Sequence, residues 1–139
     1  MSESALHQLL VQLLIENVKR IVPQELWGFI CADINQYNLP SQMVEGYRPD
    51  VFYQYKNTMI IGEAKTSNDV ERRHSREQYK AYVRKCSLFQ GKAHLLIAVP
   101  WTEYATACNI VHRVKNQYPG DYTYKVIEGF ETFYETNPS

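Results

Sequence analysis

The segment Ala93–Val99 limits the possible folds more than any other part of this sequence. It is an almost uninterrupted apolar run, and Pro100 follows it directly. A strand that is apolar on both sides needs cover on both sides, which is typical of sheets with helices packed on each face. We therefore expect an α/β domain whose sheet lies between helices.

The neighbouring segments predict the other elements. Apolar residues recur at three- and four-residue steps from Leu6 to Ile21, which indicates an amphipathic helix that begins after Ser2 and is closed by Pro23. The other expected elements are strands at Leu26–Ile34, Val44–Tyr55 and Thr58–Ala64, a charged helix from Asn68 to about Leu88, a helix capped by Thr102 that stops at Tyr118, and a strand at Tyr122–Ile127. The order αβββαβαβ predicts a mixed sheet flanked by helices.

Length and charge restrict the classes of protein that remain. The chain has 139 residues, 45% of them hydrophobic, which suits one domain over residues 1–139 with a core that needs no disulfide or metal. Fifteen basic residues balance fifteen acidic ones, so the formal net charge is zero. Because there is no overall positive field, any attraction to phosphate must be local.

Cysteine spacing and hydropathy predict the compartment. Cys31, Cys86 and Cys108 form an odd set without CxxC spacing, which favours free thiols in a reducing interior. The apolar run Leu9–Ile15 lacks a preceding basic region and a cleavage site, so we do not expect it to be a signal peptide. No segment has the roughly 20 apolar residues of a membrane span, and we expect a soluble, cytoplasmic protein without membrane contact.

Three charged residues in the expected hairpin carry the chemical information. If Lys56-Asn57 forms a two-residue turn, Asp50 lies directly opposite Glu63. Residues opposed on one face have Cβ atoms roughly 4.5 to 5.5 Å apart. Lys65 shares the face of Glu63 because side chains alternate along a strand.

Two carboxylates at this spacing repel each other unless a positive charge lies between them. A divalent cation that prefers oxygen ligands would remove the repulsion, and Mg²⁺ fits best, with Mn²⁺ expected to substitute. The alternative is an edge hairpin whose charged side chains are simply solvated.

The motif Pro49-Asp50 followed by Glu63-Ala64-Lys65 resembles that of the PD-(D/E)xK nuclease superfamily, which has the restriction-endonuclease-like fold. The resemblance extends over the common core, roughly residues 2–99. It implies a metal-dependent nuclease that hydrolyses phosphodiester bonds in DNA and leaves 5′-phosphate products. It also implies that Asp50, Glu63 and the carbonyl of Ala64 hold the metal while Lys65 assists the reaction.

Further residues match RecB-type members of that superfamily. Gln78 and Tyr82 resemble their Gln-x-x-x-Tyr motif and share one helix face, where they are expected to align the scissile strand. The resemblance also implies that a residue of the first helix completes the metal shell. His7 resembles the family histidine, although the usual preceding glycine is absent, and Glu3 is the competing candidate.

The positions of the basic residues around the expected helix indicate which of them can face the candidate site. Arg72, Arg76 and Lys80 form a stripe nearly opposite Gln78, at about 100° per residue, which indicates a solvated face. The residues expected to contact phosphates of nucleic acid are instead Arg48, Lys56, His74 and Lys85.

Two other functions remain open beside a DNA nuclease. One is a nuclease-like module that binds nucleic acid or a protein partner without cutting, and the other is an interaction module that uses its tyrosine-rich surface. The resemblance leaves open a homodimer or a subunit of a larger complex in repair, recombination, phage or defence systems. It also leaves open whether the DNA is single-stranded, double-stranded or branched.

Overall fold

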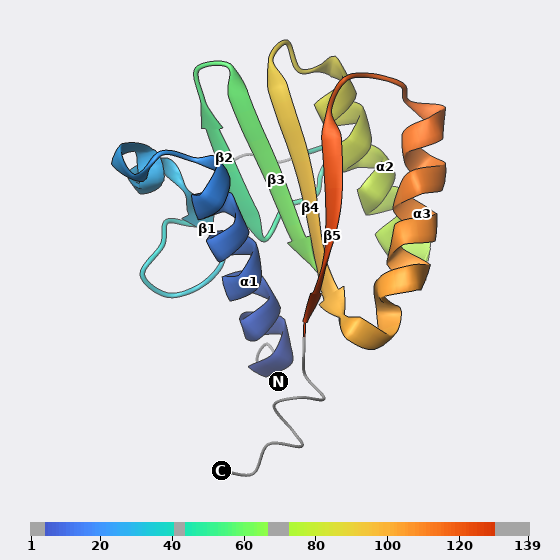
Figure 1. Ribbon diagram of the computed structural model, residues 1–139, viewed down its shortest axis with the longest axis horizontal. Coiled ribbons are helices and arrows are strands. Elements are labelled where there is room, and N and C mark those ends of the chain that lie inside the picture. Colours follow the sequence, from blue (N-terminus) through green and yellow to red (C-terminus); the bar gives the residue numbers. More distant parts are fainter. Residues whose placement is uncertain (1–4, 41–43, 67–72, 130–139) are drawn as a thin grey trace.

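Five strands form one mixed sheet in the computed structural model, which describes residues 5–40, 44–66 and 73–129 (Figure 1). Their order in the sheet follows the chain: β1 (Cys31–Ala32), β2 (Val51–Tyr55), β3 (Thr58–Ala64), β4 (Lys92–Pro100) and β5 (Thr123–Gly129). β1, β2 and β3 pair antiparallel, whereas β3, β4 and β5 pair parallel. The predicted α/β fold with a mixed sheet flanked by helices is confirmed.

Helices cover both faces of this sheet. α1 (Ala5–Ile21) packs on one face, mainly on β3 and β4, while α2 (Arg73–Leu88) and α3 (Tyr104–Gln117) pack side by side on the other. Short 3₁₀ helices, η1 (Gln24–Phe29) and η2 (Trp101–Glu103), precede β1 and α3. None of the helices in the described part of the chain is both long and apolar enough to cross a membrane.

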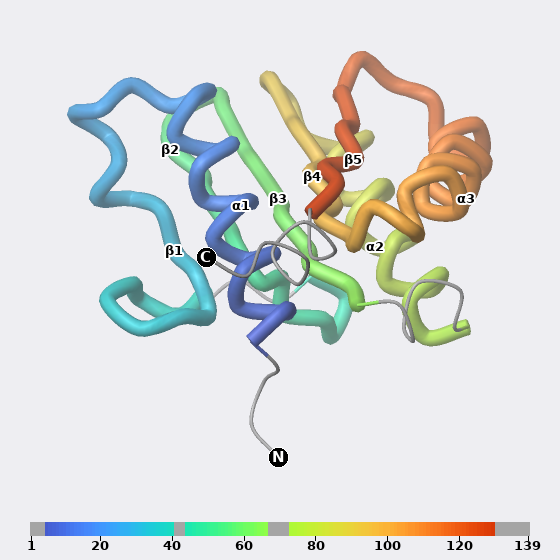
Figure 2. Tube along the Cα trace, turned by 60° about the horizontal axis from the view of Figure 1, so that its bottom comes forward, coloured from blue at the N-terminus to red at the C-terminus, as the bar shows by residue number. Residues whose placement is uncertain are grey.

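The parallel strands all end at one edge of the sheet, which we call the carboxyl edge. Figure 1 shows the ends of β3, β4 and β5 there, together with the beginning of α1, and Figure 2 brings this edge forward. The turn between β2 and β3 lies at the opposite edge. The chain therefore brings four separate elements together at the carboxyl edge.

The two faces of β3 belong to two separate apolar clusters. Ile60 and Ala64 pack with Leu10, Leu14 and Val18 of α1. The alternate residues Met59 and Ile61 pack instead with α2 and α3. Because side chains alternate along a strand, Glu63 projects toward α2 rather than α1.

The strand predicted at Leu26–Ile34 is mostly wrong. Pro23, with φ −58°, begins the 3₁₀ helix η1, and only Cys31–Ala32 pair as a strand. The indole Nε1 of Trp27 donates to the carbonyl of Val22 at 2.9 Å, so this aromatic side chain packs back on the end of α1. The aromatic and branched residues of this segment are therefore explained by half-buried packing, not by the hydrogen-bonded pairing of a strand.

The strand predicted at Val44–Tyr55 is correct only from Val51 onward. Val44 and Tyr47 form a tight turn in which Glu45 and Gly46 have φ of 52° and 89°. Two consecutive positive φ values are characteristic of a type I′ turn, for which glycine is favoured. The chain then crosses Pro49, which has no amide hydrogen to donate, before β2 begins.

The ends of the two later helices differ from expectation. α2 ends at Leu88 as predicted, and its predicted start at Asn68 lies outside the described residues. Thr102 does not cap α3, because it lies within η2, and Glu103 is the N-cap residue without a side-chain cap bond. The predicted strands at 58–64, 93–99 and 122–127 are confirmed within two residues at each end.

Candidate active site

The β2–β3 hairpin has the register predicted from its two-residue turn. Tyr55 pairs with Thr58 and Val51 pairs with Gly62, so the next opposed pair beyond the ladder is Asp50 and Glu63. The backbone amide of Ala64 donates a hydrogen bond to Oδ2 of Asp50 at 2.9 Å. This bond holds the Asp50 carboxylate against the end of β3, at the carboxyl edge.

Glu63 is a buried carboxyl group beside a second one. Its exposure is 5% and that of Asp50 is 8%. Burial raises the pKa of Glu63 well above its ordinary value, and the negative charge of Asp50 raises it further, while Lys65 and Tyr82 oppose the shift. The two acids are therefore close enough to disfavour ionisation of both, as the sequence predicted.

Lys65 lies within the same buried group. Its Nζ is 3.6 Å from Oε2 of Glu63 and donates a hydrogen bond to Oε1 of Gln78. The backbone amide of Lys65 donates to the carbonyl of Ala98 at 2.9 Å, which continues the pairing with β4 for one residue beyond β3. Lys65 is thus held both by its backbone amide and by its side-chain ammonium group.

The two α2 residues predicted to be functional both reach this cluster. The Tyr82 hydroxyl donates to Oε1 of Glu63 at 2.7 Å, and burial next to Glu63 raises the pKa of Tyr82, which keeps it a donor. Gln78 accepts from Lys65 one helical turn earlier. Both polar groups are bonded to side chains of the cluster, and they act here as positioning residues for Glu63 and Lys65.

Of the two candidates on the first helix, His7 is placed next to the cluster. Its Nε2 is 3.5 Å from Oδ2 of Asp50, and the two side chains are 15% and 12% exposed. Glu3, the competing candidate, lies outside the described residues. His7 is therefore the described residue of α1 that can extend the set of metal ligands beyond Asp50 and Glu63.

Sequence reasoning missed the clamp that holds the 44–47 turn on α2. The Arg84 guanidinium donates to both carboxylate oxygens of Glu45, with Nε at 2.9 Å from Oε2, and also to the hydroxyl of Tyr118 at 2.9 Å. This turn leads directly into Arg48, Pro49 and Asp50. Gly46 was the available signal for the turn, because a type I′ turn needs positive φ at its central residues and therefore favours glycine.

The predicted phosphate-contacting residues do not form one group. Arg48 is exposed two residues before Asp50, and the His74 ring is exposed and lies edge-on to Tyr47, with centroids 5.4 Å apart. Lys85 is partly buried on α2, two turns beyond Gln78. Lys56 lies in the hairpin turn, separated from Asp50 by the length of β2, about 17 Å at 3.3 Å per residue. The structure does not bring Lys56 to the cluster.

The donor set fits a Mg²⁺-type ion with few protein ligands. In residues 5–40, 44–66 and 73–129, no group of three or more His, Cys, Asp and Glu side chains is arranged to hold a metal ion. Mg²⁺ is usually bound through one or two carboxylates plus water and substrate phosphate, so the pair Asp50 and Glu63 is sufficient in kind. When both buried carboxylates are ionised beside one lysine, the cluster carries a formal negative charge, and a bound cation would favour that state.

Comparisons with known proteins add no assignment. No family model matches the sequence, and neither a curated protein nor a solved structure matches it.

Proposed function

We propose that this protein is a metal-dependent nuclease of the PD-(D/E)xK type that hydrolyses phosphodiester bonds in DNA. The single observation that supports this most is the buried opposition of Asp50 and Glu63, with Lys65 3.6 Å from Glu63. Buried charges of this kind reduce stability unless they are paired, so a chain that keeps three of them together at a sheet edge has a chemical reason to do so.

In this proposal Asp50 and Glu63 hold the metal, with His7 and the backbone carbonyl of Ala64 as the further candidate ligands. When bound, the ion lowers the pKa of a water ligand and offsets negative charge on the phosphate. The chain's own residues keep the two carboxylates in place. The Ala64 amide fixes Asp50, and the Tyr82 hydroxyl fixes Glu63.

Lys65 supplies a positive charge at the point where negative charge develops on the phosphate. The amide oxygen of Gln78 accepts one of the three hydrogens of the Lys65 ammonium group. This bond keeps the ammonium group from pairing with Glu63 alone. A prearranged charge of this kind needs no reorganisation during the reaction, which makes it effective in stabilising a transition state.

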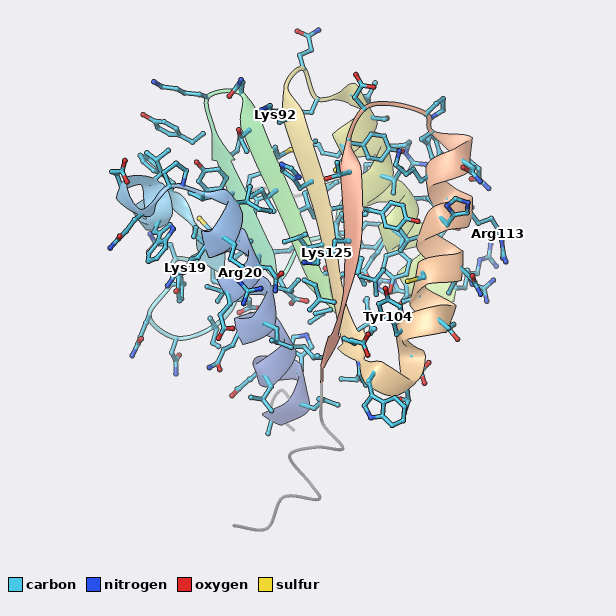
Figure 3. The ribbon with its side chains drawn as sticks, in the orientation of Figure 1. Lys19, Arg20, Lys92, Tyr104, Arg113 and Lys125 are labelled. Carbon is cyan, nitrogen blue, oxygen red and sulfur yellow. The ribbon has the colours of Figure 1, made fainter. Side chains whose placement is uncertain are left out.

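The decisive experiment incubates the purified protein with linear, single-stranded, branched and circular DNA in Mg²⁺, Mn²⁺ or EDTA. We expect cleavage with either metal and none in EDTA. Lys65→Ala should cut at least about 100-fold more slowly. Lys92→Ala is the matched control, because Lys92 is an exposed lysine at the opposite edge of the sheet (Figure 3), and it should cut at the wild-type rate.

Wild-type inactivity on every substrate in both metals would overturn the proposal. The module that binds without cutting would then be favoured, because each motif residue would still be present. Affinity for DNA that does not change with metal would support that reading.

A further inference from the structure

A second group of basic residues lies on the far side of α2 from Lys65. A hollow of about 310 Å³ lies between α2 and α3, lined by Arg76, Thr106, Asn109, Ile110 and Arg113. Arg76 and Arg113 are both exposed, and Figure 3 shows Arg113 extending outward from α3. Two guanidinium groups from different helices thus border one polar depression.

The chemistry of this hollow suits a phosphate group. Arginine presents a planar fork of N–H donors that matches phosphate oxygens, and the amide of Asn109 and the hydroxyl of Thr106 add neutral donors. Among the described residues, no carboxylate belongs to the lining, and Ile110 is its apolar member.

Among the described residues of α2, two further basic side chains flank Arg76 along the helix. Arg73 lies one turn before Arg76 on α2 and is exposed, while Lys80 one turn after it is paired with Glu77 at 3.5 Å. The prediction that Arg76 lies on a solvated face is confirmed by its exposure, and this face also borders α3 and its Arg113.

The hollow also has a defined relation to the candidate active site. Gln78 faces the sheet and bonds Lys65, whereas Arg76 is two residues earlier and therefore about 200° around the same helix. The two locations are separated by one helix, roughly 10–12 Å across with its side chains. A strand that reaches both locations must therefore pass around α2, which takes several steps at about 3.4 Å per step.

We propose that Arg76 and Arg113 bind a backbone phosphate of the DNA strand, a few nucleotides from the bond that is cut. The inference rests on the proposed function, because it takes the same DNA to lie across α2 from the Lys65 side to the α3 side. Contacts to phosphate position a duplex or strand without reading its sequence, so the site adds affinity and register but no base preference.

The test removes both charges and measures how DNA binding depends on salt. Arg76→Gln/Arg113→Gln is compared with Arg20→Gln/Lys92→Gln, which changes the net charge equally at exposed residues on α1 and at the start of β4 (Figure 3). Binding of labelled single-stranded and duplex DNA is followed by fluorescence anisotropy in EDTA, so that no cleavage occurs. Thermal unfolding of each variant establishes that it is folded.

We expect the slope of log affinity against log salt to fall in magnitude by about 1 to 2 for Arg76→Gln/Arg113→Gln and to stay unchanged for the control. Equal slopes in both double variants would overturn the inference, as would a wild-type protein that does not bind DNA. Inorganic phosphate that displaces DNA at matched ionic strength would assign the hollow to a small anion instead.

Failure of this inference can be separated from failure of the proposed function. Wild-type cleavage with an unchanged slope in Arg76→Gln/Arg113→Gln would reject the inference alone. A reduced slope in that variant, with no wild-type cleavage in Mg²⁺ or Mn²⁺, would retain the phosphate site and reject the nuclease.

Discussion

The alternate residues of β3 give its two faces opposite characters. Toward α1, Gly62 lets the helix approach closely, since a Cβ there would lie 3.2 Å from Cβ of Val51 and 3.4 Å from a Leu14 methyl group. Toward α2, the strand continues from Ile61 into Glu63 and then Lys65, whose charges are buried. One face contributes tight apolar packing, and the other retains an electrostatic arrangement that packing alone does not favour.

This contrast separates the part of the strand that serves stability from the part to which we assign the proposed reaction. Apolar contacts on the α1 side gain free energy from burial in proportion to the area removed from water. On the α2 side, the shifted pKa of Glu63 means that ionising the cluster opposes folding when no cation is bound. Substitutions on the two faces should therefore change stability and activity independently.

The substitution Glu63→Gln should produce the largest effect, a fall in the rate of DNA cleavage. Losing one of the two carboxylates should slow the proposed hydrolysis by roughly 1000-fold, equivalent to about 4 kcal/mol in the activation free energy. The same variant should be more stable than wild type in EDTA, because it no longer repels Asp50. Cleavage rates and urea unfolding measure the two effects, and a variant that is both active and less stable would contradict the comparison.

Leu14→Ala should produce the next largest effect, on the α1 face. Leu14 is fully buried against Gly62 and Val51, so the cavity and lost burial should lower the free energy of unfolding by about 3 kcal/mol. Cleavage per folded molecule should remain at the wild-type level at a temperature where the variant is folded. A selective loss of cleavage would show that the two faces are coupled.

A smaller effect concerns pH in the absence of metal. The unfolded chain releases the Glu63 proton near its ordinary pKa of 4.5, whereas the folded chain keeps it to a higher pH. The unfolded state is therefore favoured as pH rises above 4.5, by up to about 1.4 kcal/mol per pH unit for one proton. Unfolding in EDTA across this range should show the decline in wild type and its loss in Glu63→Gln, while Mg²⁺ should reduce it.

The smallest effect is expected from Arg84→Met, outside both faces of β3. Its ion pair with Glu45 has side chains 34% and 44% exposed, and solvent-exposed pairs contribute about 0.5 kcal/mol. A double-mutant cycle with Glu45→Gln isolates this pair from the bond to Tyr118. A coupling above about 2 kcal/mol would show that the 44–47 turn behaves as part of the core.

The hairpin was predictable because local rules determine its geometry. A two-residue turn at Lys56-Asn57 and strand alternation together specify that Asp50 faces Glu63, and the observed pairing has that register. The helix positions of Gln78 and Tyr82 were equally local, since residues four apart share a face. His7, by contrast, was a candidate only through the family resemblance, because its contact with Asp50 joins segments far apart in the sequence.

The features that were not predicted depend on contacts between distant segments. Trp27 packs on the end of α1, which replaces the expected strand by η1, and Arg84 joins Glu45 across 39 residues. The helical periodicity correctly placed Arg76 opposite Gln78. The periodicity of α2 carried no information about α3, which contributes Arg113 to the other side of the hollow.

The hairpin register has a consequence for where the chain tolerates insertions. One extra residue between Asp50 and Tyr55, or between Thr58 and Glu63, would reverse which side of the sheet an acid points to, and the pair would be separated. Extra residues at Lys56-Asn57 leave both strands in step, because the ladder itself maintains the alignment. A spectroscopic tag or a short peptide inserted at that tip should leave the acidic pair opposed at the other end.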